Sequence, residues 1–175
     1  MDEIVKQAIH KWPKVPACFG WLALDCRGDW YLRDDTVQNK GPFPQSKGSK
    51  LVHSKLIEFI NRNYESDELG QYYFQNGPQK VFVELELAPY ILRFNKDKSI
   101  YTHTGVGVKA EECYVDEQGR VYLKTELGLG LIHSLDMDLL ADQIIDKKFI
   151  PEPIQQTVLE DKFGYVKSPI NNSKK

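Results

Sequence analysis

Alternation of hydrophobic and polar residues is the strongest pattern along the chain, and it predicts β-strands. In residues 80–87 every second residue from Val81 to Leu87 is aliphatic. Because successive side chains of a strand point to opposite faces, these residues would share one buried face. A two-residue turn at Ala88-Pro89 would place Glu84 opposite Arg93 in a β-hairpin. Alanine-proline suits such a turn poorly, so a longer or cis-Pro connection that shifts this register stays open.

A second strand signature occurs three times along the chain. It consists of an aspartate, a glycine three residues later and a tyrosine six residues later, at Asp25, Gly28 and Tyr31, at Asp67, Gly70 and Tyr73, and at Asp116, Gly119 and Tyr122. Aspartate holds the first corner of a turn by accepting from backbone amides, and glycine takes the left-handed conformation of the adjoining bulge. We therefore expect three hairpins with all three glycines at positive φ. Since this turn is common by itself, a structural repeat and a coincidence of common turns both stay open.

Three segments have the spacing of hydrophobic residues that is typical of helices. They are residues 2–11, about 50–63 and about 135–148. Ser49 or Ser54 would cap the second helix, and Ser134 would cap the third. Residues 34–49 would form a long polar loop ahead of the second helix.

Together these segments predict an α+β fold with mainly antiparallel sheets and two or three helices. Repeated β-hairpin/helix units are one way to build it. No stretch of the sequence reads as a linker, so we expect a single compact domain over residues 1–175. Two repeat-related halves, at about 15–105 and 106–150, are the alternative organisation, and residues 167–175 would form a flexible tail.

Composition narrows the possible partners and the location of the protein. The 23 basic and 25 acidic residues give a net charge of −2, too small to attract nucleic acid or anionic lipid over long range. Three cysteines at unrelated spacings suggest neither a disulfide framework nor a zinc site, and free thiols suit a reducing compartment. No signal peptide or membrane-spanning run is visible. We therefore expect a cytoplasmic protein that binds neither nucleic acid nor membrane and has no cofactor.

Several short segments resemble an uncharacterised proteobacterial family, known only as a domain of unknown function. They are residues 28–35 (GDWYLRDD), 41–44 (GPFP) and 73–81 (YFQNGPQKV), within a similarity that spans roughly residues 15–145. A second family of unknown function is similar in layout, including a strand that ends as residues 86–90 (ELAPY) do here. The resemblance to this second family implies repeated α+β units and supplies no catalytic residue.

The residues Lys47, Gly48, Ser49 and Lys50 are the candidate ligand site. Two cations and a glycine at the start of a helix can hold a phosphate or a carboxylate. The segment lacks the other residues of the Walker pattern. A solvated loop with a capping serine is the competing interpretation.

The tyrosines Tyr31, Tyr73 and Tyr122 occupy one position of the recurring hairpin and form a candidate protein interface. If the residues on either side of each tyrosine face the core, the tyrosines face away from it. We then expect at least two of the three hydroxyls near solvent, where tyrosine suits a protein interface. The alternative is a second packed face beneath the helices.

Other residue patterns give weaker indications of chemistry. Glu84 and Glu86 share one face of a strand and could act as an acid–base pair, although solvent-facing charges are the simpler interpretation. The four histidines are scattered, and the cysteines show no nucleophile signature. Arg27 next to Cys26 could make that thiol reactive, although a neutral turn residue is the simpler interpretation. The sequence therefore favours a non-enzymatic binding or regulatory module that engages a protein partner or a small anionic ligand. An enzyme with dispersed carboxylates or histidines and a structural assembly subunit are the alternatives.

Overall fold

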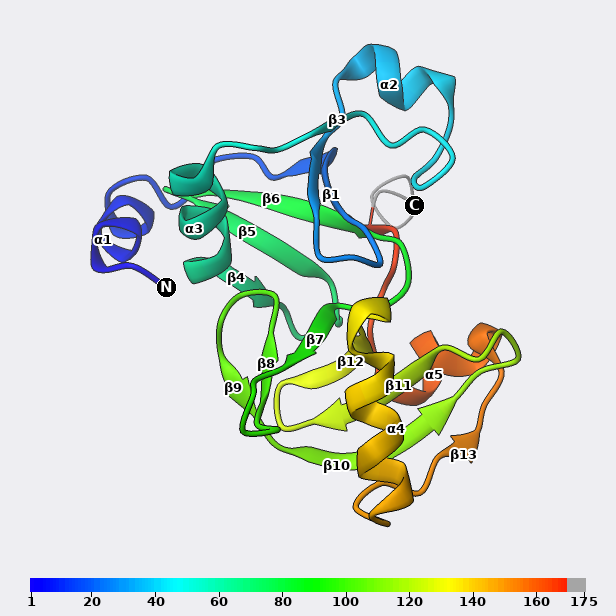
Figure 1. The fold of residues 1–175 in the computed structure, drawn as a ribbon. Coiled ribbons are helices and arrows are strands. Elements are labelled where there is room, and N and C mark those ends of the chain that lie inside the picture. The colour runs from blue at the N-terminus through cyan, green and yellow to red at the C-terminus, as the bar shows by residue number, and fades with distance from the viewer. Residues whose placement is uncertain (170–175) are drawn as a thin grey trace. The chain divides into compact units, whose positions relative to one another are not determined.

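The computed structural model describes residues 1–169 and confirms the α+β fold (Figure 1). The chain forms two compact units. Unit 1 comprises residues 1–25, 29–86 and the segment from 165 on, and unit 2 comprises residues 26–28 and 87–164. Among residues 1–169, no helix is both long and apolar enough to cross a membrane.

Unit 1 contains a six-stranded sheet in the order β3-β2-β1-β6-β5-β4. Its strands are β1 (Cys18–Leu24), β2 (Trp30–Leu32), β3 (Ser49–Lys50), β4 (Tyr64–Ser66), β5 (Tyr72–Asn76) and β6 (Gln79–Leu85). β1 runs parallel to β6, and the other neighbouring strands are antiparallel. The helices of unit 1 are α1 (Glu3–Lys11), α2 (Asp35–Lys40) and α3 (Ser54–Arg62).

The core of unit 1 lies between α3 and one face of this sheet (Figure 1). Leu22 and Leu24 of β1 are buried on this face, as are Val83 and Leu85 of β6. Ile60 of α3 is also buried. Each fully buried aliphatic side chain stabilises the fold by about 1.5 to 3 kcal/mol relative to an exposed one. This burial fixes which face of the sheet α3 covers.

Unit 2 contains a seven-stranded sheet in the order β13-β10-β11-β12-β7-β8-β9. Its strands are β7 (Tyr90–Phe94), β8 (Ile100–Thr102), β9 (Gly107–Val108), β10 (Ala110–Val115), β11 (Val121–Thr125), β12 (Gly128–Ile132) and β13 (Glu152–Pro153). β7 runs parallel to β12, and β10 runs parallel to β13. Two α-helices, α4 (Met137–Ile145) and α5 (Leu159–Phe163), and two 3₁₀ turns, η1 (Ser134–Asp136) and η2 (Gln156–Val158), complete unit 2.

The two sheets share one strand order. If β1–β6 are matched in chain order to β7–β12, both sheets place the first strand beside the second and parallel to the sixth. Unit 1 inserts α3 between β3 and β4, whereas a single residue separates β9 from β10. The sequence suggested two repeat-related halves with a boundary near residue 105. In the structure β7 and β8, which precede that boundary, pair within the sheet of unit 2. A single compact domain stays a prediction.

All three hairpin turns form as expected from the sequence. The glycines have positive φ values of 80°, 74° and 76° at Gly28, Gly70 and Gly119. A fourth turn of the same kind joins β7 to β8: the Asn95 amide donates to the Ser99 carbonyl at 2.8 Å, and Lys98 has φ 66°. Residues 95–98 read as a turn in the sequence, but the aspartate–glycine signature does not cover them, because asparagine replaces aspartate and lysine replaces glycine.

Helix α1 lies where the sequence predicted a helix, but the start of the second predicted helix is wrong. Residues 49–50 pair with β2 as β3, and α3 begins at Ser54. The cap is His53, whose Nδ1 accepts from the Leu56 amide at 3.3 Å. The third predicted helix begins as the 3₁₀ turn η1, followed by α4.

The predicted hairpin after residues 80–87 does not form. β6 lies between β1 and β5, and Arg93 of β7 pairs with Tyr101 of β8 in the other sheet. Glu84 pairs instead with Ala23 of β1. The predicted pairing of Glu84 with Arg93 is therefore wrong, because β6 finds its neighbours far along the chain.

Candidate functional site

An apolar groove of about 210 Å³ lies in unit 1 between α3 and the sheet. Its lining contains no charged residue and consists of Trp21, Leu22, Leu32, Leu51, Leu56, Ile60, Phe74, Asn76 and Val81. Three of these side chains are unusually exposed for their size: Trp21 at 41%, Leu32 at 45% and Leu56 at 37%. Val52, next to the groove residue Leu51, is 84% exposed. Clustered exposed apolar side chains mark interaction surfaces.

A bulge in β1 makes the groove possible. The register between β1 and β6 shifts between Cys18 and Leu22, and Gly20 has φ 76°. A regular strand would send Trp21 and Leu22 to opposite faces. With the bulge, both side chains line the groove. A glycine inside a run of large apolar residues was the sequence signal for this bulge.

The segment that follows Gly48 forms one wall of the groove. It pairs with β2 through Lys50 opposite Tyr31, and the Leu51 amide donates to the Trp30 carbonyl at 2.8 Å. Gly48 has φ 89°, and a Cβ atom there would lie 2.2 Å from the Leu32 carbonyl oxygen. Only glycine therefore lets this wall approach β2 so closely.

We expect the substitution Gly48→Ala to destabilise the protein by about 2 kcal/mol or more, because the added Cβ atom combines a backbone clash with a left-handed conformation. Chemical denaturation would measure this loss. Gly105→Ala is the matched control, since Gly105 has φ 85° but a Cβ atom there has no neighbour within 4 Å. Equal losses in the two variants would contradict the close approach at Gly48.

The candidate ligand residues Lys47 to Lys50 lie beside three carboxylates. Lys47 Nζ lies 3.2 Å from Asp25 Oδ2 and 3.3 Å from Glu86 Oε2, and Lys50 Nζ lies 2.6 Å from Asp29 Oδ2. Burial lowers the pKa of Lys47, but the two carboxylates outweigh burial and raise the pKa overall. Since α3 begins only at Ser54, the helix N-terminus assumed for this site is also elsewhere. An anion would have to compete with these carboxylates.

Residues 34–48, which include α2, pack around the buried side chain of Arg33. The guanidinium donates to the carbonyls of Ser46 at 3.0 Å, Gly20 at 3.2 Å and Gly41 at 2.8 Å. Burial lowers the pKa of Arg33, and nearby Glu84 opposes that shift. Arg33 thus fixes the segment that leads into the groove wall. The predicted loop over 34–49 is wrong in part, because Asp35–Lys40 form α2 and Ser49 belongs to β3.

Glu84 and Glu86 have different surroundings. Glu84 is buried and its Oε2 accepts from Ser168 Oγ at 2.5 Å, whereas Glu86 pairs with Lys47. The Leu85 amide between them donates to the Lys167 carbonyl at 2.8 Å. The solvent-facing interpretation is therefore wrong for Glu84. Of the predicted tail, residues 170–175 lie outside the described residues.

The three tyrosines of the hairpins differ in burial. Tyr122 is 0% exposed, and its hydroxyl donates to Asp116 Oδ2 at 3.1 Å. Tyr73 is 6% exposed, and burial together with Glu65 raises its pKa to about 12. Tyr31 is half-buried, with Lys47 Nζ 5.3 Å from its ring centroid. A side chain without exposed surface offers a partner nothing, so Tyr122 is not part of the site proposed below.

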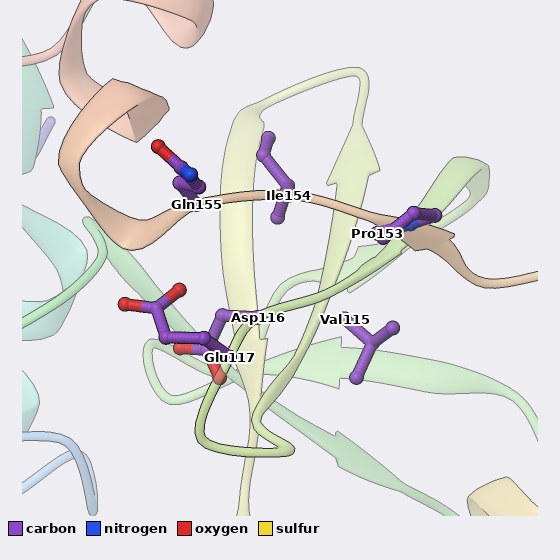
Figure 2. A pocket seen from close by; sticks show the side chains of 6 residues that line it. All are labelled: Val115, Asp116, Glu117, Pro153, Ile154 and Gln155. Carbon is purple, nitrogen blue, oxygen red and sulfur yellow. The ribbon is translucent and has the colours of Figure 1, made fainter.

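A second pocket, of about 320 Å³, lies in unit 2 at the end of β10 (Figure 2). Figure 2 shows Val115 to Glu117 on one side and Pro153 to Gln155 on the other. Its two carboxylates already have partners: Asp116 binds Arg120, and Glu117 Oε2 accepts from the Gln156 amide at 3.0 Å. These contacts hold the turn and the segment after β13 together, which is a structural role.

Burial keeps two further titratable side chains, those of His103 and Cys113, in their neutral forms. His103 is buried, and burial lowers its pKa to about 3. Burial raises the pKa of the Cys113 thiol to about 11, which suppresses the reactive thiolate. Within the described part of the chain, no group of three or more His, Cys, Asp or Glu residues could hold a metal ion.

Two solved structures of DUF1285 family proteins are similar to this chain. A crystal structure of a DUF1285 family protein from Silicibacter pomeroyi DSS-3 has a TM-score of 0.50 and 15% identity, covering 81% of this chain and 84% of that chain. At this identity the likeness concerns the fold alone. A second crystal structure, of a DUF1285 family protein from Shewanella baltica OS155, has a TM-score of 0.47 and 17% identity. The match covers 70% of this chain and 91% of that chain.

Comparison with protein families gives the identity of the chain. No curated protein matches it. Residues 1–170 match the family DUF2944, described as "Protein of unknown function (DUF2946)". The resemblance to an uncharacterised family is therefore confirmed, and the chain belongs to the DUF2944 family, whose function is unknown.

Proposed function

We propose that this protein is a non-enzymatic binding module that takes an apolar segment of a protein partner into the groove of unit 1. The observation that supports this function is the exposure of Trp21, Leu32 and Leu56 around a cavity lined without any charge. Such grooves bind apolar anchors of peptides and helices. We also propose the cytoplasm as its location, since the three cysteines are free thiols.

The energetics of the groove suit a modest, specific interaction. Burying a fully exposed large apolar side chain contributes about 1.5 to 3 kcal/mol, and Trp21, Leu32 and Leu56, each 37–45% exposed, would each contribute less than half of that. A partner that covers Trp21, Leu32 and Leu56 gains several such contributions, from which the loss of translational and rotational freedom is subtracted. The proposal of a small anionic ligand at Lys47 and Lys50 has less support, because each lysine already has a carboxylate partner.

The proposed function can be tested by site-specific photo-crosslinking. p-Benzoylphenylalanine placed at position 56 should crosslink one predominant partner in cell extract, and an excess of unmodified protein should compete for that partner. Leu69 is the matched control position, because it is 72% exposed but lies in a turn outside the groove. Identical crosslinking patterns from positions 56 and 69 would reject the groove as the binding site.

A further inference from the structure

We propose that residues 165–169, called the strap here, regulate the groove of unit 1 through the buried side chains of Glu84 and Arg33. The inference rests on the proposed function, because it concerns the regulation of the same groove. Three sets of contacts within unit 1 support it: those of the strap with β6, those between Glu84 and Arg33, and those of Arg33 with the groove.

Backbone hydrogen bonds attach the strap to two places in unit 1. The Val166 amide donates to the Gly70 carbonyl at 3.0 Å, in the turn before β5. The Leu85 amide, at the end of β6, donates to the Lys167 carbonyl at 2.8 Å. A segment that is held by few bonds opens at a lower cost than the core of a sheet. The strap can therefore detach while the sheet stays folded.

The side-chain contact of the strap reaches a buried carboxylate. Ser168 Oγ donates to Glu84 Oε2 at 2.5 Å, and Glu84 is only 4% exposed. A buried carboxylate depends on hydrogen bonds and opposite charges, because burial removes it from water. Detachment of the strap would remove this hydrogen bond and admit water to the carboxylate. The charge that Glu84 presents to its neighbours is therefore sensitive to the strap.

Glu84 and Arg33 are buried opposite charges on the same face of the sheet. Glu84 pairs with Ala23 of β1, and Ala23 pairs with Tyr31 of β2. Because side chains alternate along a strand, Arg33 lies on the same face as Tyr31 and Glu84. Burial of Arg33, which is 3% exposed, lowers its pKa, and the charge of Glu84 opposes this shift. The position of the guanidinium therefore depends on Glu84, since little water screens the attraction.

Arg33 in turn holds both backbone features that form the groove. Its guanidinium donates to the Gly20 carbonyl at 3.2 Å, in the bulge that lets Trp21 line the groove. It also donates to the Ser46 carbonyl at 3.0 Å, two residues before Gly48 and the wall of the groove. A shift of the guanidinium would move the bulge and the wall together. Arg33 is thus a positioning residue for the groove.

A second connection runs from the strap along β6 to the same wall. Glu86 directly follows Leu85, and its Oε2 lies 3.3 Å from Lys47 Nζ. Lys47 directly precedes Gly48, where the wall begins. Because the strap holds the Leu85 amide, its detachment would loosen the end of β6 and the contact of Glu86 with Lys47. Both connections therefore predict that a detached strap leaves the groove less firmly held.

Fluorine NMR of the full chain labelled with 5-fluorotryptophan would test the inference without any partner. The three tryptophans give three resonances, which single tryptophan-to-phenylalanine variants assign. Trp21 lines the groove and reports on its geometry. Trp30 is buried and reports on folding, and Trp12, which ends α1 and is 51% exposed, serves as the internal control.

Weakening of the strap should change the groove. Ser168→Ala removes the hydroxyl that donates to Glu84, so it should shift the Trp21 resonance and leave that of Trp12 unchanged. Ser99→Ala is the matched control, because it removes a hydroxyl that donates to a carboxylate at 2.7 Å in an exposed turn of unit 2. This control should leave the Trp21 resonance at its wild-type position.

Glu84→Gln separates the charge from the attachment of the strap. Glutamine keeps an oxygen that can accept from Ser168, so the Leu85 amide should exchange its hydrogen at the wild-type rate. The loss of charge near Arg33 should nevertheless shift the Trp21 resonance. An unchanged Trp30 resonance would show that the variant is folded, and Ser168→Ala is the milder change because Ser168 is partly exposed.

The outcomes separate the inference from the proposed function. An unchanged Trp21 resonance in either Ser168→Ala or Glu84→Gln overturns the inference, and so does an equal shift in Ser99→Ala. In the Ser168→Ala background, crosslinking of the partner from position 56 should fall about threefold, as couplings through such contacts give. If Trp21 responds to the strap but position 56 captures no partner, the connection is supported and the proposed function fails.

Discussion

Replacing Asp116 with alanine is expected to lower the free energy of unfolding by about 3 to 5 kcal/mol, the range for removing one partner of a buried charge pair. The Asp116 side chain is fully buried. It accepts from the Gln118 amide at 2.9 Å, from the amide and Nε of Arg120 at 2.9 and 2.7 Å, and from the Tyr122 hydroxyl at 3.1 Å. The variant leaves all of these donors without their acceptor. Chemical denaturation would measure the loss.

Asp97→Ala is the control for this substitution. Asp97 also lies in a hairpin turn, but its bonds to the Ser99 amide and hydroxyl are exposed to solvent. Its loss should therefore lower the free energy of unfolding by about 1 kcal/mol or less. A similar effect at both positions would mean that the turn itself, rather than the burial of Asp116, determines stability.

The stability that Asp116 provides should also depend on pH. Burial alone raises the pKa of this carboxyl, but the hydrogen bonds from Arg120 and Gln118 outweigh burial and hold the pKa below its usual value. A carboxyl with a lowered folded-state pKa stabilises the protein above its unfolded pKa of about 4 and loses this contribution as pH falls through the folded value. The difference between wild type and Asp116→Asn should therefore shrink below about pH 4. A constant difference would contradict an ionised Asp116.

Tyr122→Ala is expected to lower the free energy of unfolding by about 3 to 5 kcal/mol, because it removes a fully buried aromatic ring. Tyr122→Phe keeps the ring and loses only the hydrogen bond to Asp116, so we expect about 1 kcal/mol. Tyr31 is half-buried and serves as the comparison. Tyr31→Ala should lower the free energy of unfolding by less than about 2 kcal/mol. An unchanged melting temperature in Tyr122→Ala would show that the ring is not in the core.

Little of the groove proposed as a binding site can be predicted from sequence patterns. Its residues come from β1, β2, the segment after β3, α3, β5 and β6. All of them except Asn76 read locally as ordinary core residues. The exposure of Trp21 and Leu32 arises only because a bulge at Gly20 and a close approach at Gly48 position the surrounding backbone. The sequence contained both glycines, but only the packed structure shows what they expose.

For the candidate ligand site, the sequence identified the lysines but not the carboxylates that bind them. Lys47 and Lys50 read as free cations because their carboxylate partners lie at distant positions in the sequence. Asp25 directly follows β1 and Glu86 directly follows β6, and the parallel pairing of these two strands brings both carboxylates to Lys47. Local spacing cannot predict such a pairing.

The sequence by itself determined the turns, most of the strands and the α+β class. Gly28, Gly70 and Gly119 take positive φ because a local sequence of aspartate and glycine favours that turn, whatever surrounds it. Tertiary structure decided which strands pair, where Glu84 and Tyr122 lie, and which apolar residues stay exposed. The physical reason is that side-chain alternation specifies the two faces of a strand but not its neighbours. Those neighbours depend on burial summed over segments far apart in the chain, as the parallel pairs β1–β6 and β7–β12 show.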